Sequence, residues 1–66
     1  MIPFYRLDTD NQNKLKAMER QMAELERQLN RPDLHFYRNA IQRELDQLEH
    51  DYYSFWQFLD TLYNNK

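Results

Sequence analysis

The 66-residue chain contains no glycine and no cysteine, and it has only two prolines. Without cysteine, the chain can form no disulfide, no thiolate metal site and no cysteine nucleophile. Without glycine, it lacks the glycine-rich loops that bind phosphate groups and the residue that most tight hairpin turns require. These two absences exclude a disulfide-stabilised fold and a phosphate-binding glycine loop.

Long apolar runs and a strong excess of one charge are missing as well. No segment approaches the ~20 consecutive apolar residues that span a bilayer, and the N-terminus has neither the basic lead nor the cleavage site of a signal peptide. We therefore expect a cytoplasmic protein without membrane association. Nine basic and eleven acidic residues give a net charge of −2, which provides no general attraction for nucleic acid. The length allows one small domain, residues 1–66.

The first periodic segment covers residues 10–29. Its apolar residues recur in steps of three and four, which is the heptad spacing of a helix that packs along one stripe. They are Leu15, Met18, Met22, Leu25 and Leu29. Most other positions hold Lys, Glu, Arg or Gln, which favour helix. Asp8, Thr9 and Asp10 are good N-cap residues, and Thr9 with Gln12 has the spacing of a capping box.

A second periodic segment covers residues 33–63 and follows a break at Pro32. Proline cannot continue a helix because it lacks the backbone N–H, but it suits the first turn of a new one. The apolar residues of this segment again follow helical steps. They are Leu34, Ile41, Leu45, Leu48, Tyr52, Phe55, Leu59 and Leu62. The fold class that we predict is therefore all-α, with helices over about residues 10–29 and 33–63 joined as an antiparallel hairpin.

The second predicted helix is longer than the first and extends past it. Counting outward from the predicted turn places Leu15 opposite Leu48. The same register brings Leu7 to Trp56. We therefore expect residues 1–8 to form an extended segment that covers part of this overhang.

The overhang is rich in aromatic side chains, with six of the ten aromatic residues between positions 51 and 63. A single hairpin would leave several of these in water, and association would recover ~1.5–3 kcal/mol for each one buried. We therefore predict a self-association or partner interface at this end. Its residues are Tyr52, Phe55, Trp56, Phe58, Leu59, Leu62 and Tyr63. The expected partner is a second copy, completing a four-helix bundle, or a larger protein. The alternative is that these rings pack within the chain's own core.

The residues needed for chemistry are not arranged as a recognisable site. Ser54, the only serine, has no base with an orienting partner at helical spacing. His35 and His50 lie fifteen residues apart, and Asp46 with His50 would bind a metal ion only weakly. We predict no enzymatic activity, no catalytic residues, no metal and no cofactor.

A basic stripe on the first helix supports an alternative function. Its members recur at spacings that place them roughly on the outer face, and they are Lys16, Arg20, Arg27 and Arg31. In a dimer, two such stripes could contact RNA, while Phe36 and Tyr37 near the hairpin turn could stack on bases. Glutamates flank the stripe, so a solvated face of mixed charge is the competing interpretation.

In outline, the predicted architecture resembles short helical hairpins that dimerise into four-helix bundles, such as the plasmid copy-number regulator Rop. The resemblance rests on the two-helix outline without a shared motif, so it implies no functional residues. The predicted function is a small non-enzymatic interaction module, a regulator or inhibitor that self-associates and binds through its aromatic C-terminal helix face. Rop-like RNA binding through the basic stripe is the alternative, and we expect nucleic-acid binding to be the weaker hypothesis.

Overall fold

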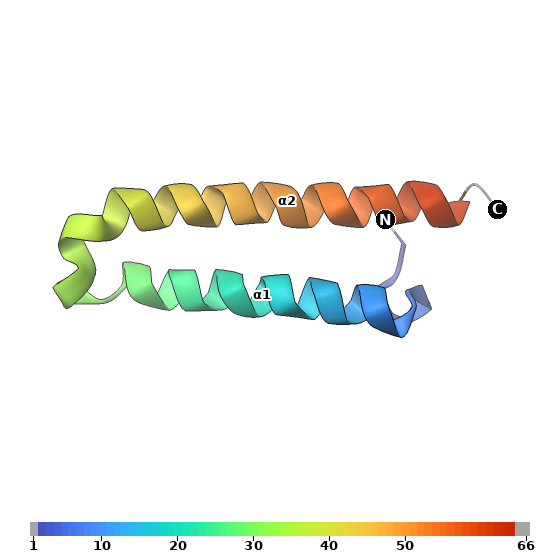
Figure 1. Cartoon of the computed structure of the whole chain (residues 1–66), viewed down its shortest axis with the longest axis horizontal. Coiled ribbons are helices and arrows are strands. Elements are labelled where there is room, and N and C mark those ends of the chain that lie inside the picture. Colours follow the sequence, from blue (N-terminus) through green and yellow to red (C-terminus); the bar gives the residue numbers. More distant parts are fainter. Residues whose placement is uncertain (1, 65–66) are drawn as a thin grey trace.

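The computed structural model describes residues 2–64, which form two long antiparallel α-helices (Figure 1). In chain order, the elements are the 3₁₀ helix η1 (Phe4–Arg6), α1 (Thr9–Leu29), the 3₁₀ helix η2 (Pro32–Tyr37) and α2 (Arg38–Asn64). No strand occurs among the described residues. The predicted all-α hairpin is therefore confirmed, and the other three positions of the predicted domain lie outside the described residues.

Helix α1 begins where the Asp8 side chain caps it. The backbone of Asp8 is extended, and its carboxylate accepts a 3.0 Å hydrogen bond from the backbone N–H of Asn11. The cap satisfies one free amide of the first turn and places a negative charge at the positive end of the helix dipole. The predicted capping box is wrong, because Thr9 is already helical and the Gln12 side chain donates to carbonyls of the preceding segment.

The connection between the two helices is longer than predicted. Residues 32–37 form the 3₁₀ helix η2, and the α-helix predicted from residue 33 begins only at Arg38. Leu34 departs from helical geometry, with φ −105° and ψ 15°, and its half-buried side chain packs against the core near the tip. One isolated turn gains little from helix propensity, so this packing outweighs the local preference for α-helix.

The core consists of two clusters of buried side chains. The cluster near the chain termini contains Ile2, Leu7, Leu15, Tyr52 and Leu59. The cluster nearer the tip contains Leu25, Ile41 and Leu45. The predicted pairing of Leu15 with Leu48 is wrong, because Leu15 packs in the cluster of Tyr52, one helical turn further along α2, whereas Leu48 contacts the other cluster. The longer connection at the tip accounts for this shift in register.

The N-terminal segment covers the overhanging end of α2, as the sequence predicted. The indole Nε1 of Trp56 donates a 2.9 Å hydrogen bond to the carbonyl of Ile2. At the other end of the segment, the backbone N–H of Asp8 donates to the Tyr63 hydroxyl at 3.3 Å. The segment is not extended throughout, because Phe4–Arg6 form one 3₁₀ turn.

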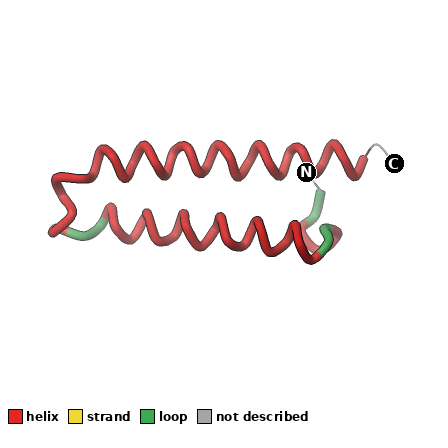
Figure 2. The backbone as a smooth tube through the Cα atoms, in the orientation of Figure 1, coloured by secondary structure: helices red, strands yellow, loops and turns green. Residues whose placement is uncertain are grey.

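The hairpin is long and thin. Its extents are 49 × 17 × 14 Å, and its Cα radius of gyration is 14.6 Å, compared with ~11 Å for a compact domain of this length. It exposes 5251 Å² of surface, compared with roughly 4,600 Å² for a compact monomer of 8.3 kDa. Figure 2 shows the two helices side by side, and no third helix of the described chain lies along them.

Candidate functional site

The seven predicted interface residues do not form one accessible surface. Tyr52 and Leu59 belong to the core of the chain itself, with 6% and 2% of their surface exposed. The Tyr52 hydroxyl also donates a 2.6 Å hydrogen bond to the Glu19 carboxylate, which joins α2 to α1. Burial, reinforced by this hydrogen bond, raises the pKa of the Tyr52 hydroxyl. These two side chains therefore stabilise the monomer and are not available to a partner.

Trp56 and Tyr63 are half-buried beside the N-terminal segment. The Trp56 ring meets the Phe4 ring edge to face, with 6.5 Å between the centroids, and meets the Tyr52 ring in the same way at 5.6 Å. Such edge-to-face contacts are favourable arrangements of aromatic rings. Trp56 and Tyr63 therefore pack against the chain's own core, to which Tyr52 and Leu59 also belong. This is the alternative interpretation that the sequence left open.

Three of the predicted interface residues remain accessible on one flank of α2. Phe58 and Leu62 are 57% and 47% exposed, and Phe55 is half-buried. Their spacings of three and four residues place them on neighbouring turns of the same helix face. The Nζ atom of Lys14 lies 6.0 Å from the centre of the Phe55 ring. We call Phe55, Phe58 and Leu62 the open flank.

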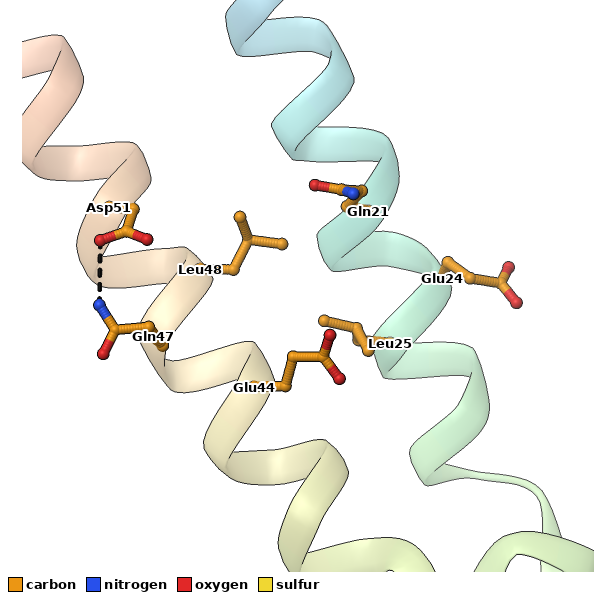
Figure 3. Close-up of a pocket in the computed structure, with 7 residues that line it drawn as sticks. All are labelled: Gln21, Glu24, Leu25, Glu44, Gln47, Leu48 and Asp51. Carbon is orange, nitrogen blue, oxygen red and sulfur yellow. Dashed lines mark hydrogen bonds between the residues drawn. The ribbon is translucent and has the colours of Figure 1, made fainter.

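A groove between α1 and α2 continues the open flank toward the tip. Its first hollow, of ≈ 440 Å³, is lined by Lys14, Ala17, Met18, Asp51 and Phe55. Its second hollow, of ≈ 450 Å³, is lined by Gln21, Glu24, Leu25, Glu44, Gln47, Leu48 and Asp51 (Figure 3). Asp51 lines both hollows, so they are adjacent. In Figure 3, Leu25 from α1 and Leu48 from α2 point toward each other across the groove.

The groove has an apolar floor and a mainly acidic rim. Glu44 points toward α1 in Figure 3, while Asp51 accepts a 3.0 Å hydrogen bond from the Gln47 amide. Glu24 points away from the hollow and is ion-paired with Arg27. Hydrogen bonds from the Arg27 guanidinium lower the pKa of the Glu24 carboxyl. The free carboxylates of the rim therefore come from α2.

Sequence reasoning did not identify the groove as a site. The relevant signal was present, because Met18 and Leu25 on one helix and Leu48 on the other belong to the predicted apolar stripes. The incorrect register placed Leu48 against Leu15. Only the observed pairing of the helices shows that this side of the stripes is left open.

The tip of the hairpin exposes two more aromatic rings. Phe36 and Tyr37 are 93% and 62% exposed. The Phe36 ring contacts the His35 ring edge to face, with 5.9 Å between the centroids. Arg38 follows directly as the first residue of α2. The tip therefore presents apolar rings beside positive charge.

The predicted basic stripe is largely engaged within the chain, and only three of its members lie on α1, because Arg31 follows the end of that helix and caps η2. Arg27 and Arg31 are each ion-paired with a nearby carboxylate. The Nζ atom of Lys16 lies 5.5 Å from the centre of the Phe4 ring. The hydrogen bonds from Arg31 lower the pKa of the Asp33 carboxyl. These contacts favour a solvated face of mixed charge over a surface that is free to bind phosphates.

Residues 2–64 contain neither a cluster of metal-ligating side chains nor a helix that could span a membrane. No three His, Asp or Glu side chains of this part gather as a metal site would require. Neither described α-helix contains a stretch long and apolar enough to cross a bilayer. No protein-family model, curated protein or solved structure matches the chain. The groove, the open flank and the tip are therefore interpreted from their own chemistry.

Proposed function

We propose that the chain is a small cytoplasmic interaction module that self-associates through the groove and the open flank. The observation that carries this proposal is the apolar strip on one side of the hairpin. The strip begins at the half-buried Leu48 in the groove, whose floor includes the buried Leu25, and continues through Phe55 to Phe58 and Leu62. Apolar patches bordered by polar side chains are characteristic of protein interaction surfaces.

The dimensions of the hairpin support a stable interface. One face of the hairpin measures 49 by 17 Å in outline. This outline is comparable with the ~800 Å² that each partner buries in a complex of standard size. A complex formed along the whole hairpin would therefore have an ordinary interface area, whereas end-to-end contact would bury much less.

The energetics favour association as well. Removing Phe58 and Leu62 from water would contribute ~1.5–3 kcal/mol for each fully buried side chain. In a two-fold dimer each residue occurs twice, so the contribution doubles. Chains of this size have little stability of their own, because they bury a small fraction of their surface. Self-association would therefore stabilise the folded hairpin substantially.

A second copy is the partner that the shape favours. Two antiparallel helices with one open apolar side form half of a four-helix bundle, and another two-helix unit with a similar strip completes it. An identical chain supplies such a unit without any further component. A groove on a larger protein is the competing partner, and the experiment below distinguishes the two.

The experiment is sedimentation equilibrium of the full chain at low to high micromolar concentration. We expect dimers in the wild type and at least tenfold weaker association in the double variant Phe58→Ser, Leu62→Ser. Tyr53→Ser is the matched control, because Tyr53 is 59% exposed on the same helix but lies two residues from Phe55, which places it on a different face from the open flank. A strictly monomeric wild type at high micromolar concentration would refute self-association and leave the larger protein as the partner.

A further inference from the structure

Residues 2–7, which we call the lid, cross from the beginning of α1 to α2 (Figure 1). Trp56 on α2 donates its indole N–H to the carbonyl of Ile2. Gln12 on α1 donates its side-chain amide to two further carbonyls of the lid. The side chains of Ile2 and Leu7 are buried beneath it, each only 5% exposed. The lid is therefore held by a few apolar side chains and by hydrogen bonds to its main chain.

The first turn of α1 does not depend on the lid for its backbone hydrogen bonds. Asp8, which follows the lid, accepts from the N–H of Asn11 through its carboxylate and from the N–H of Gln12 through its carbonyl. The backbone N–H groups of Arg6 and Leu7 donate to carbonyls inside the lid. Opening of the lid would therefore leave the backbone hydrogen bonds of α1 intact.

The lid joins α1 through Leu7 and Asp8, whose backbones are both extended, with ψ of 152° and 165°. The 3₁₀ turn of the lid ends before these residues, and the α-helical turns begin after them. Rotation about their backbone therefore moves the lid and leaves α1 in place. Fixing the backbone of the lid costs conformational entropy, and opening returns it. A segment held by few buried contacts opens at a lower free energy than the whole fold.

Helix α2 remains supported when the lid is open, because α1 also contacts it there. Leu15 of α1 is fully buried in the same cluster as Leu59 of α2. At the beginning of α1, the backbone N–H of Asp8 donates to the hydroxyl of Tyr63. These contacts lie outside the lid and reach the last turns of α2, so opening does not require α2 to unwind.

Opening would uncover a second apolar surface beside the open flank. This surface contains Leu59, which lies in the same cluster as the buried side chains of the lid, and Trp56, which packs against that cluster. Leu59 is three residues from Leu62 and four from Phe55, so it adjoins the open flank on neighbouring helical turns. The closed lid therefore separates two parts of one apolar face of α2.

We propose that the lid opens while both helices stay folded, and that the closed lid limits the apolar surface offered to a second copy. The second part rests on the proposed self-association through the open flank. A chain with an open lid presents this flank together with Trp56 and Leu59, so it binds a second copy more tightly than a closed chain does. The apparent affinity then rises with the fraction of chains whose lid is open.

Hydrogen exchange at Trp56 tests the opening in the unmodified chain. Its indole N–H binds the lid, whereas its backbone N–H lies within α2. Relative to the unfolded chain, we expect at least about tenfold less protection for the indole N–H, because lid opening is easier than unfolding. Its exchange should also depend less on urea, since opening exposes less surface. Equal protection and equal urea dependence of the two groups would overturn the lid.

The backbone N–H of Leu7 provides a second probe of the same motion. It donates to the carbonyl of Phe4 inside the lid, and Leu7 is buried against the hairpin. We expect its exchange to show the same weak urea dependence as the indole N–H of Trp56, because one opening exposes both groups. An indole N–H that exchanges readily while Leu7 exchanges only by global unfolding would contradict a lid that moves as a unit.

Variants that weaken the lid test its effect on association. Gln12→Ala removes a donor to its carbonyls, and Ile2→Ser removes one of its buried side chains. We expect each to strengthen self-association by roughly threefold or more in sedimentation equilibrium, because more chains have an open lid. Tyr5→Ser is the matched control, since Tyr5 lies in the lid but is 79% exposed, and it should associate like the wild type.

Self-association and the lid can fail separately. A dimeric wild type whose association is unchanged or weakened in both lid variants would overturn the limiting role of the lid and leave self-association intact. Loss of helical circular dichroism in both variants would show that the helices need the lid, and would overturn its independent opening. A wild type and variants that all stay monomeric at high micromolar concentration would refute self-association and its control by the lid.

Discussion

Trp56 and Ile2 are joined by a hydrogen bond between positions 54 residues apart, from the indole Nε1 to the backbone carbonyl at 2.9 Å. This bond attaches the N-terminal segment to the C-terminal half of α2. Ile2 is itself only 5% exposed, so its side chain fills the core at the same place. The segment thus covers rings that α1 is too short to reach, and it leaves the open flank uncovered.

We expect Ile2→Ala to destabilise the hairpin by about 2 kcal/mol or more, because it removes buried apolar atoms and leaves a cavity beside Trp56. Urea unfolding followed by the fluorescence of Trp56, the only tryptophan, measures the effect. Tyr5→Ala is the control, since Tyr5 is 79% exposed in the same segment and should change stability by less than about 0.5 kcal/mol. Equal effects of the two substitutions would contradict the role of the segment as a cover.

Tyr52→Phe should cost about 1 kcal/mol, because it removes the hydrogen bond to Glu19 and leaves the buried ring in place. The cost remains modest because the Glu19 carboxylate is exposed and can bind water. Thermal unfolding monitored by circular dichroism gives the difference. Tyr53→Phe serves as the comparison, because Tyr53 is 59% exposed. A Tyr52→Phe variant as stable as wild type would show that the bond contributes nothing.

The same tyrosine predicts how stability depends on alkaline pH. Burial and then the Glu19 hydrogen bond raise the pKa of the Tyr52 hydroxyl above its ordinary value of about 10. In the alkaline range the folded state therefore binds more protons than the unfolded state, so the contribution of Tyr52 is fully present below about pH 10 and declines above it.

Absorbance of tyrosinate provides the measurement. Among the five tyrosines, one should ionise at a higher pH than the others, and Tyr52→Phe should remove that late phase. Simultaneous ionisation of all five in the folded chain would contradict the prediction. Tyr53→Phe should leave the late phase unchanged.

The proposed dimer predicts that the thermal stability of the chain depends on protein concentration. A dimer is favoured by mass action, so the wild-type unfolding midpoint should rise with protein concentration. The double variant Phe58→Ser, Leu62→Ser should unfold at nearly the same temperature at all concentrations. Calorimetry over a hundredfold concentration range measures the slope. A wild-type midpoint that is independent of concentration would argue against the proposed dimer.

Gln12 links the N-terminal segment to α1. Its side-chain amide donates to the carbonyls of Phe4 and Leu7, at 3.2 and 3.0 Å. We expect Gln12→Ala to lower stability by about 1 kcal/mol, because the part-buried Leu7 carbonyl loses its side-chain donor, whereas the Phe4 carbonyl still accepts from the backbone N–H of Leu7. Gln47→Ala removes an exposed hydrogen bond to Asp51 and should have almost no effect on unfolding of the monomer. Amide hydrogen exchange should also show faster exchange in residues 4–7 of the Gln12 variant.

Much of the fold was predictable because it depends on local chemistry. Two helices follow from the helix-forming composition and from the heptad spacing that includes Leu15 and Leu25. The proline at position 32 marks where the chain turns between them. The cover provided by the N-terminal segment was also predictable, since the second helix had to be longer than the first. The 3₁₀ geometry of residues 32–37 was not, because the packing of Leu34 decides it.

The candidate site was only partly predictable. Sequence located the aromatic end of α2 but could not separate Tyr52 and Leu59, which are buried, from Phe58 and Leu62, which are exposed. All four lie at helical spacings. Hydrophobic periodicity shows which side of a helix is apolar, but it does not show which of those residues another segment covers.

The sequence by itself determined the helical class and the two-helix division, because these depend on residue types and their order. The tertiary structure decided the register, the groove and the rings that remain in water. Burial depends on which side chain lies opposite, and the geometry of the connection at Leu34 sets that pairing for the whole length of the hairpin.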